Sequence, residues 1–341
     1  MIHPHITDAL KVPDLVRLTE NTVLIRFESM KVYSALAAVR DLRDRGVIRP
    51  GQTLVDSSSG IYAYALALAC HRYGMRCHIV ASTTVDATTL AQLEVLGATV
   101  EQVTPSPSLK LDQELRVRRV RELLAARPDV HWMRQYHDNV HYLGYREVAD
   151  LVSAAVRDDR PLSVVGGVGS GASTGGLVEH LRRRDPSVRL VGVQPFGSVT
   201  FGSQDHHDPA AIIAGIGSSI VFDNVRHALY DAVHWMDFTH AMSGTVALLR
   251  DHAVFAGLSS GAAHLAAIHE ARRHPDRLHV VIGADTGHRY VESVHSRHRD
   301  ALDPAALKPV EVDTPEAMSM PWSTMAWNRA AAPAPWKEPA A

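Results

Sequence analysis

The chain has 341 residues, of which 46% are hydrophobic and 21% charged, and its formal net charge is −2. This length suits two globular domains of ~150 residues each, and the charge balance argues against nucleic acid as a partner because no broad positive field exists. Only two cysteines occur, and no apolar run reaches ~18 residues, which together predict a cytoplasmic protein that does not enter a membrane.

Short apolar runs alternate with helical patterns along most of the chain. The first half contains a strand leading into a loop over 51–60, strands over 75–82 and 98–105, and helices over 61–74 and 88–97. The second half repeats the rhythm with strands over 162–171, 188–195 and 278–285 and helices over 175–184 and 261–273. Strands that alternate with helices form parallel sheets covered on both faces. We therefore predict an α/β fold: two three-layer α/β domains with mainly parallel sheets, which face each other across a cleft.

A glycine-rich loop at 166–176, with the sequence GGVGSGASTGG, separates a predicted strand from a predicted helix. Its small residues would let backbone N–H groups approach an anion at the helix start, so phosphate is the natural ligand. Residues 167–172 also fit the G-x-G-x-x-A pattern of dinucleotide sites, but the next strand ends at Gln194, where that pattern needs an acid. The Gly-Lys-Ser/Thr of a P-loop is absent. A tight turn that only packs helix on strand is the remaining alternative.

Three more loops of small and hydroxyl-bearing residues lie beside predicted strands or helices. They are DSSSG at 56–60, GLSSGAA at 257–263 and GADTGHRY at 283–290. The serines of the first loop could cap a helix, or they could hold a carboxylate with their hydroxyls and free N–H groups. Four loops of this kind on an α/β scaffold predict one shared crevice.

Lys31 lies in FESMKVYSA, residues 27–35, where an extended apolar run gives way to a helical pattern. An isolated lysine is usually a solvated surface cation, and this short stretch alone does not exclude that interpretation.

Taken together and in order, these segments resemble the fold-type II pyridoxal phosphate enzymes, a tryptophan synthase β-like fold, over roughly residues 12–292. In particular, they resemble the branch of cysteine synthase (O-acetylserine sulfhydrylase) and 2,3-diaminopropionate synthase. SMK at 29–31 is similar to the family's S-x-K, which implies that Lys31 forms the Schiff base with pyridoxal 5'-phosphate.

The other motifs imply further roles. GGVGSGAS resembles the family's G-T-G-G-T phosphate cup, which implies cofactor binding by Gly169, Ser170, Gly171, Ala172 and Ser173. GLSSGAA implies that Ser259 is the partner of the pyridine nitrogen. The DSSSG loop, and RQYHDNVHY at 134–142, which is similar to the family's Q-F-x-N-P-x-N, imply substrate binding by Ser58, Ser59, Gly60 and Gln135.

Three features depart from the family pattern. Val32 and Tyr33 stand where relatives have Asp or Asn followed by Arg, and the loop before the lysine is shorter. Ile61 replaces an asparagine that in relatives contacts the cofactor, and the segment around Gln135 is compressed. The departures predict a diverged biosynthetic enzyme rather than a housekeeping cysteine synthase.

A hydroxyl such as Ser259 would leave the cofactor ring largely neutral, which favours loss of a β-leaving group over transamination. We predict β-replacement on an activated serine, O-acetyl- or O-phosphoserine, through an aminoacrylate. A sulfur or nitrogen nucleophile would then give a cysteine-like or diaminopropionate-like amino acid in a specialised biosynthetic pathway. One alternative is a lyase, a β-eliminase or dehydratase of the serine/threonine ammonia-lyase type. The other is a noncatalytic ligand-binding homologue, which the loss of the asparagine at Ile61 favours.

The resemblance also implies an organisation. We expect a smaller mobile domain over 36–147, a larger cofactor-binding domain from 1–35 plus 148–310, and an extended C-terminal tail over 311–341 whose tryptophans dock on the body or on a second subunit. A homodimer that takes a small amino-acid substrate is expected. His137 and His141 have metal-like spacing, but the Glu and the helix of a zinc protease motif are absent, so we predict no metal site.

Overall fold

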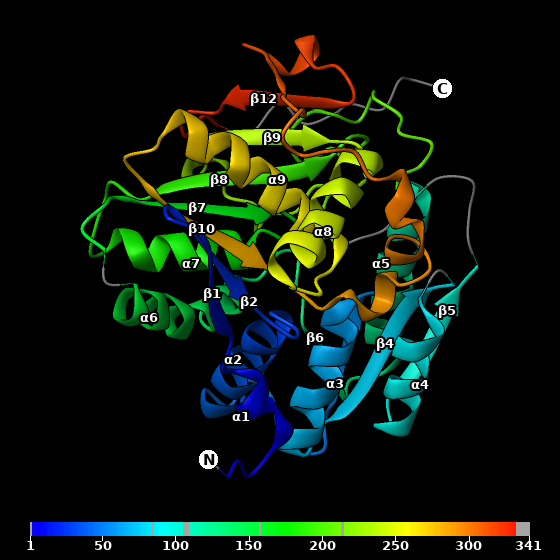
Figure 1. The fold of residues 1–341 in the computed structure, drawn as a ribbon. Helices are drawn as coiled ribbons and strands as arrows, with labels where there is room; N and C mark the ends of the chain where they lie inside the picture. Colours follow the sequence, from blue (N-terminus) through cyan, green and yellow to red (C-terminus); the bar gives the residue numbers. More distant parts are fainter. Residues whose placement is uncertain (1, 84, 105–108, 157, 213–214, 332–341) are drawn as a thin grey trace.

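The computed structural model describes residues 2–83, 85–104, 109–156, 158–212 and 215–331 (Figure 1). The smaller of its two sheets has four parallel strands in the order β5-β4-β3-β6. These strands are β3 (Thr53–Ser57), β4 (Arg76–Ser82), β5 (Thr99–Val103) and β6 (Val130–Trp132). The helices that cover the sheet are α2 (Lys31–Asp44), α3 (Ile61–Tyr73), α4 (Ala87–Val95) and α5 (Leu109–Ala126). We call this sheet with its helices the four-stranded unit.

Alternate residues of its strands enter two separate cores, as the period of a β-strand requires. Leu54 and Ile79 pack with side chains of α2, α3 and α4, whereas Val55 and Val80 pack with α5. All five residues of β3 are buried, which agrees with a central strand covered on both faces.

The larger sheet has eight strands in the order β1-β2-β10-β7-β8-β9-β12-β11. They are β1 (Asp14–Thr19), β2 (Thr22–Arg26), β7 (Leu162–Gly167), β8 (Arg189–Pro195), β9 (Ala232–Met236), β10 (Leu278–Gly283), β11 (Val310–Glu311) and β12 (Trp322–Ala326). Its centre, from β2 to β9, is parallel. We call this sheet and its helices the eight-stranded unit, and the two sheets together confirm the predicted α/β fold with mainly parallel strands.

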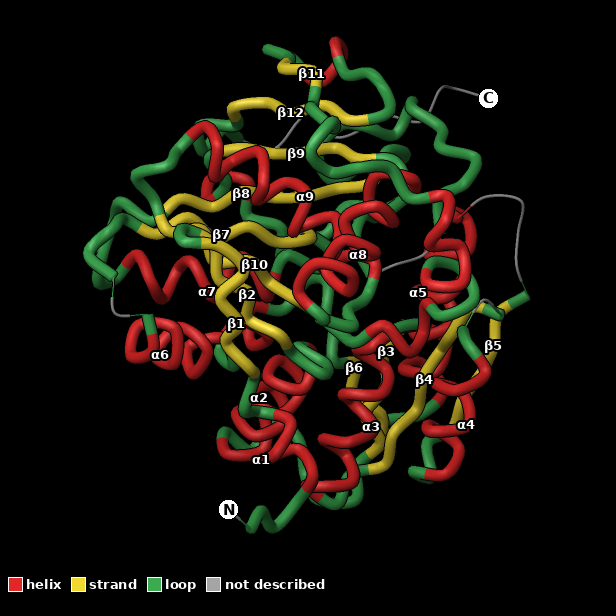
Figure 2. The backbone as a smooth tube through the Cα atoms, in the orientation of Figure 1, coloured by secondary structure: helices red, strands yellow, loops and turns green. Residues whose placement is uncertain are grey.

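Helices cover both faces of the larger sheet. Val164 belongs to a core with α6 (Tyr145–Ala155) and α7 (Ala172–Arg182), whereas its neighbour Val165 belongs to a core with α8 (Phe238–His252) and α9 (Leu258–Arg273). Figure 2 shows the strands of each sheet in yellow with red helices beside them. The short helices are α1 (Ile6–Leu10), η1 (Asn139–Tyr142), η2 (His227–Leu229), η3 (Gly287–Tyr290), η4 (His295–Asp300) and η5 (Pro315–Ala317).

The C-terminal segment adds an edge to the larger sheet up to residue 331. β12 pairs antiparallel with β9, and Trp322 and Trp327 are buried against the body of the same chain. The Trp322 indole N–H donates to Nδ1 of His234 at 3.1 Å. The third tryptophan, Trp336, lies outside the described residues.

Local sequence explains where several of these elements end. Gly74 ends α3 in the left-handed conformation at φ 66°, and its N–H donates to the Cys70 carbonyl, as a glycine C-cap does. Asp86 precedes α4, and its carboxylate accepts the Thr89 N–H at 2.9 Å, as an N-cap does. Within the described residues, no helix combines the length and apolar character needed to cross a membrane.

Candidate active site

Lys31 is the first residue of α2, and its side chain is buried with 7% exposure. Its Nζ donates to Oγ of Ser170 at 2.9 Å, although the two residues lie 139 positions apart. Backbone bonds fix the segment before it: the Phe27 N–H donates to Gly283 O and the Met30 N–H to Ala284 O, both at 2.9 Å. The end of β10 therefore places the lysine amine against the glycine-rich loop that follows β7.

Burial changes the protonation of this amine. Loss of water around Lys31 lowers its pKa from 10.5 to about 8. Close by, burial lowers the pKa of His141 to about 4, and the Lys31 charge acts in the same direction. The Nε2–H of His141 donates to the Met133 carbonyl at 2.8 Å, so its Nδ1 accepts from Ser34 at 3.1 Å. His141 is thus a neutral structural residue, whereas His137 pairs with Asp223 elsewhere.

The loop after β7 forms a cradle in which two positions require glycine. A Cβ on Gly169 would collide with the carbonyl oxygen of Gly215, and a Cβ on Gly171 would collide with that of Asn224. Gly171 also has φ 80°, a conformation that side chains rarely adopt. Ala172 and Ser173 open α7 directly after it, so free N–H groups of the first helical turn face the loop.

Ser259 lies in the first turn of α9 and is 4% exposed. A Cβ added to Gly167 would lie 3.5 Å from the Ser259 Cβ, which places this serine at the end of β7. Its hydroxyl has no hydrogen-bond partner among the residues that the structure describes. The adjacent Ser260 differs, because its Oγ accepts the Ala284 N–H at 3.0 Å. Ser259 therefore keeps a donor available for a ligand.

The serine loop after β3 begins α3 with Gly60 at the N-cap. Ser58 is buried and its N–H donates to Val80 O at 3.1 Å. The Ser59 Oγ accepts the Ser82 N–H at 2.7 Å, which ties the loop to the end of β4.

Gln135 supports this loop from behind. Its backbone N–H donates to Asp56 Oδ2, and its side-chain Nε2 donates to Ser57 O, both at 2.9 Å. Burial raises the pKa of Asp56 to about 6 against the effect of these hydrogen bonds. One N–H of the Gln135 side-chain amide is thus used within the protein, and the predicted contact of this residue with a substrate carboxylate stays a prediction.

Comparison with known proteins matches residues 17–284 to a family described as pyridoxal-phosphate dependent enzyme. The chain belongs to this family. The N-(2-amino-2-carboxyethyl)-L-glutamate synthase of Ralstonia nicotianae is 32% identical over 294 residues, which cover 82% of this chain and 85% of that protein. The cysteine synthase of Helicobacter pylori is 26% identical over 248 residues, 72% of this chain and 78% of that enzyme.

Solved structures show the same fold. The O-acetylserine dependent cystathionine beta-synthase of Helicobacter pylori aligns with a TM-score of 0.76 and 22% identity, over 85% of this chain and 98% of the other. The predicted family, its cofactor and its fold type are thereby confirmed, and so is the prediction of an enzyme of the synthase type.

The residues present fit pyridoxal phosphate. The cradle of Gly169 and Gly171 at the start of α7 suits the phosphate group, because N–H groups at a helix start attract anions. The buried amine of Lys31 suits the aldehyde, and the unpaired hydroxyl of Ser259 suits the pyridine nitrogen.

Sequence reasoning missed Arg116 on α5. Its side chain is 5% exposed, and its Nη1 donates to Ser59 Oγ at 3.3 Å. Its buried Nε has no hydrogen-bond partner among the described side chains. Among the side chains that the structure describes, which exclude those of 105–112, no carboxylate forms an ion pair with it. A signal was present, because Arg116 lies on the same helical stripe as the buried Val120 and Leu123. A buried arginine in an apolar stripe whose described contacts include no carboxylate is a candidate for binding an anionic ligand.

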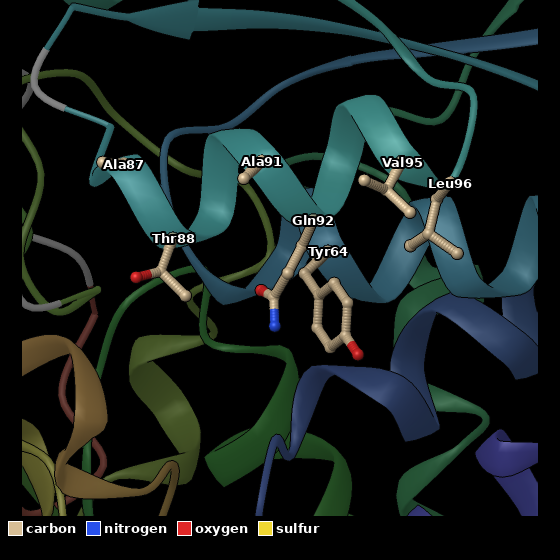
Figure 3. A pocket seen from close by; sticks show the side chains of 7 residues that line it. All are labelled: Tyr64, Ala87, Thr88, Ala91, Gln92, Val95 and Leu96. Atoms are coloured by element: carbon tan, nitrogen blue, oxygen red, sulfur yellow. The ribbon is translucent and has the colours of Figure 1, made fainter.

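A groove of about 640 Å³ lies elsewhere, between α3 and α4 (Figure 3). Its lining is mostly apolar and includes Tyr64, Gln92 and Val95. None of the predicted site residues lines it, so it is not the candidate active site.

Proposed function

We propose that this enzyme replaces the β-substituent of an activated serine with the amine of a second amino acid that carries additional carboxylate, such as glutamate. The observation that supports this choice of nucleophile is Arg116, a buried guanidinium that donates to the serine loop and has no acidic partner among the described side chains. A buried charge is costly unless it is paired, so a carboxylate of the second substrate would compensate it.

The relatives support the same choice. Two curated relatives, from Ralstonia nicotianae and Cupriavidus metallidurans, are N-(2-amino-2-carboxyethyl)-L-glutamate synthases, at 32% and 34% identity. Their name describes a 2-amino-2-carboxyethyl group on a glutamate nitrogen. The predicted β-replacement is thus supported, and of the predicted sulfur and nitrogen nucleophiles we propose nitrogen. The relatives named here are synthases, and they give the lyase alternative no support.

The serine loop and Lys31 would have different roles in this reaction. The serine loop at 58–60 would hold the α-carboxylate of the activated serine with N–H and hydroxyl groups at the start of α3. The Lys31 amine would take the proton from Cα and later return it, for which a pKa near neutrality is suitable. Bound pyridoxal phosphate supplies an electron-accepting ring that stabilises negative charge at Cα. The Cβ–O bond breaks with release of acetate or phosphate, and a Cβ–N bond forms as the attacking amine loses a proton.

Steady-state kinetics with two acceptors test this proposal. Purified enzyme receives O-phosphoserine or O-acetylserine with either glutamate or sulfide, and products are identified by mass spectrometry. We expect an N-linked product with glutamate. In Arg116→Gln the KM for glutamate should rise by about 100-fold, because a charge-assisted contact is lost, while the KM for the activated serine changes little.

Arg119→Gln is a matched control one turn further along α5, because Arg119 is partly exposed and pairs with Glu101 and Glu122. This variant should leave both KM values unchanged. A wild-type enzyme that uses sulfide far better than glutamate would contradict the proposed nucleophile. Keto acid formed without any acceptor would indicate elimination, and no turnover with any donor would favour the noncatalytic alternative.

We also propose that the enzyme is a cytoplasmic homodimer with domains at the predicted boundaries. Trp322 and Trp327 are buried within their own chain, at 1% and 4% exposure. Light scattering of the purified protein measures its oligomeric state.

A further inference from the structure

An arginine of the eight-stranded unit contacts the four-stranded unit beside the serine loop. Arg289 lies in η3, after β10, and its Nε donates to Asp86 Oδ2 at 2.9 Å, across 203 positions of sequence. Asp86 is the N-cap of α4. This ion pair therefore joins the two units directly.

The same guanidinium lies next to the end of the serine loop. A Cβ added to Gly60 would be 3.8 Å from Arg289 Nη1, which is van der Waals distance. On its other side, Nη1 is 4.0 Å from Oδ2 of the buried Asp285. The Arg289 guanidinium thus lies near one acid of each unit, Asp86 and Asp285. It also lies beside the loop to which we assign the substrate carboxylate.

The ion pair between Arg289 and Asp86 alone contributes little to the stability of the contact between the two units. The side chains of Arg289 and Asp86 are 20% and 28% exposed, and partly exposed pairs contribute little net stability. An additional anion at Gly60 changes the balance, because it would interact with Arg289 only while the two units are together. A ligand with this preference shifts the population towards the closed arrangement.

We propose that Arg289 is a positioning residue that couples binding of the substrate α-carboxylate at Gly60 to closure of the four-stranded unit. The inference rests on the proposed function only in assigning the α-carboxylate to the serine loop. It does not depend on which nucleophile completes the reaction.

The chain offers a second contact between the units that lacks charge. Oε1 of Gln113 on α5 accepts the Ser219 N–H at 2.9 Å and the Ser218 hydroxyl at 3.3 Å. A neutral contact holds the units together whether or not the ligand carries a carboxylate. Gln113→Ala therefore separates general loosening from the coupling assigned to Arg289.

The test compares two probes on the full-length holoenzyme: L-serine, and serinamide, which lacks the carboxylate charge. Dissociation constants come from calorimetry, and hydrogen exchange of peptides covering 86–95 reports closure. In the wild type we expect L-serine to bind more tightly than serinamide and to protect 86–95. In Arg289→Gln the L-serine constant should rise by about 10-fold, with serinamide unchanged and protection lost.

Asp86→Asn keeps an N-cap residue for α4 but removes the charge, so it should give the same selective loss if Arg289→Gln folds poorly. The double variant should bind L-serine no more weakly than Arg289→Gln does, because both substitutions remove the same ion pair. In Gln113→Ala any rise in the dissociation constant should be the same for both probes. Arg250→Gln, which removes an exposed ion pair with Asp251, should change neither constant.

Equal loss of both probes in Arg289→Gln, or undiminished protection of 86–95 by L-serine, would overturn the coupling. So would a wild type that binds L-serine no better than serinamide. The two proposals can fail separately. If the wild type makes no N-linked product, but Arg289→Gln selectively loses affinity for L-serine, the proposed nucleophile is refuted and the coupling is supported.

Discussion

Replacing Lys31 with methionine should stabilise the cofactor-free protein. Methionine has a similar length and no charge, and the lysine side chain is 7% exposed. The fall of the lysine pKa from 10.5 to about 8 corresponds to about 3 kcal/mol of unfavourable burial of the charged amine near neutral pH. Loss of the hydrogen bond to Ser170 offsets about 1 kcal/mol of this gain. Lys31→Met should therefore unfold with a free energy about 2 kcal/mol higher at neutral pH.

The pH dependence of this difference follows from the direction of the pKa shift. Between about pH 8 and 10.5 the unfolded wild type binds the Lys31 proton and the folded protein does not. The wild-type free energy of unfolding should therefore rise with pH across this window, and the advantage of Lys31→Met should shrink. Below about pH 8 both states of the wild type carry the proton, so the advantage is constant there.

Urea unfolding of both cofactor-free proteins, followed over a series of pH values, measures the difference. The exposed Lys308 gives a matched control, because Lys308→Met removes a lysine without changing a buried site. A Lys31→Met protein that is less stable at neutral pH, or whose advantage does not depend on pH, would show that this amine is not desolvated by the fold.

Three other substitutions have expected outcomes. Gly171→Ala should lower cofactor affinity by at least about 10-fold, because φ 80° strains alanine and its Cβ would meet the Asn224 carbonyl; a titration of the apoenzyme with pyridoxal phosphate measures this, and unchanged affinity would argue against the cradle. Ser259→Ala should retain the cofactor but lose about 10-fold in kcat, since one hydrogen bond is removed; an unaltered kcat with an unaltered cofactor spectrum would exclude the assigned contact. Asp56→Asn should lower the free energy of unfolding by about 2 kcal/mol, because an amide placed against the Gln135 N–H and its neighbours cannot accept every bond that the carboxylate accepts; urea unfolding at wild-type stability would contradict this.

Much of the fold follows from local pattern. The alternation of strands and helices predicts the two parallel sheets, because the residues that form each element are neighbours in sequence. The starts of two helices differ from the prediction: α7 begins at Ala172 and α9 at Leu258, each three residues earlier than expected. Glycines weaken the helical signal there, but tertiary contacts require them. A Cβ on Gly175 would collide with the Tyr142 ring, and one on Gly261 with Thr245.

The site was predictable only in part. The ordered motifs predict that Lys31, the glycine loop and Ser259 meet, and the structure places Lys31 against Ser170. The hydrogen bond from Gln135 to Ser57 was not predictable, because it joins residues 78 positions apart. Arg116 and Arg289 were also missed, since their meaning depends on burial and on partners in distant segments.

The measurement that tests the central claim most directly is the covalent attachment of the cofactor. Borohydride treatment of the cofactor-loaded protein fixes the carbon–nitrogen bond between pyridoxal phosphate and its lysine. Digestion and mass spectrometry then locate the added mass. The account predicts that this mass lies on Lys31 and is absent from Lys31→Ala, and attachment at another lysine, or at none, would contradict it.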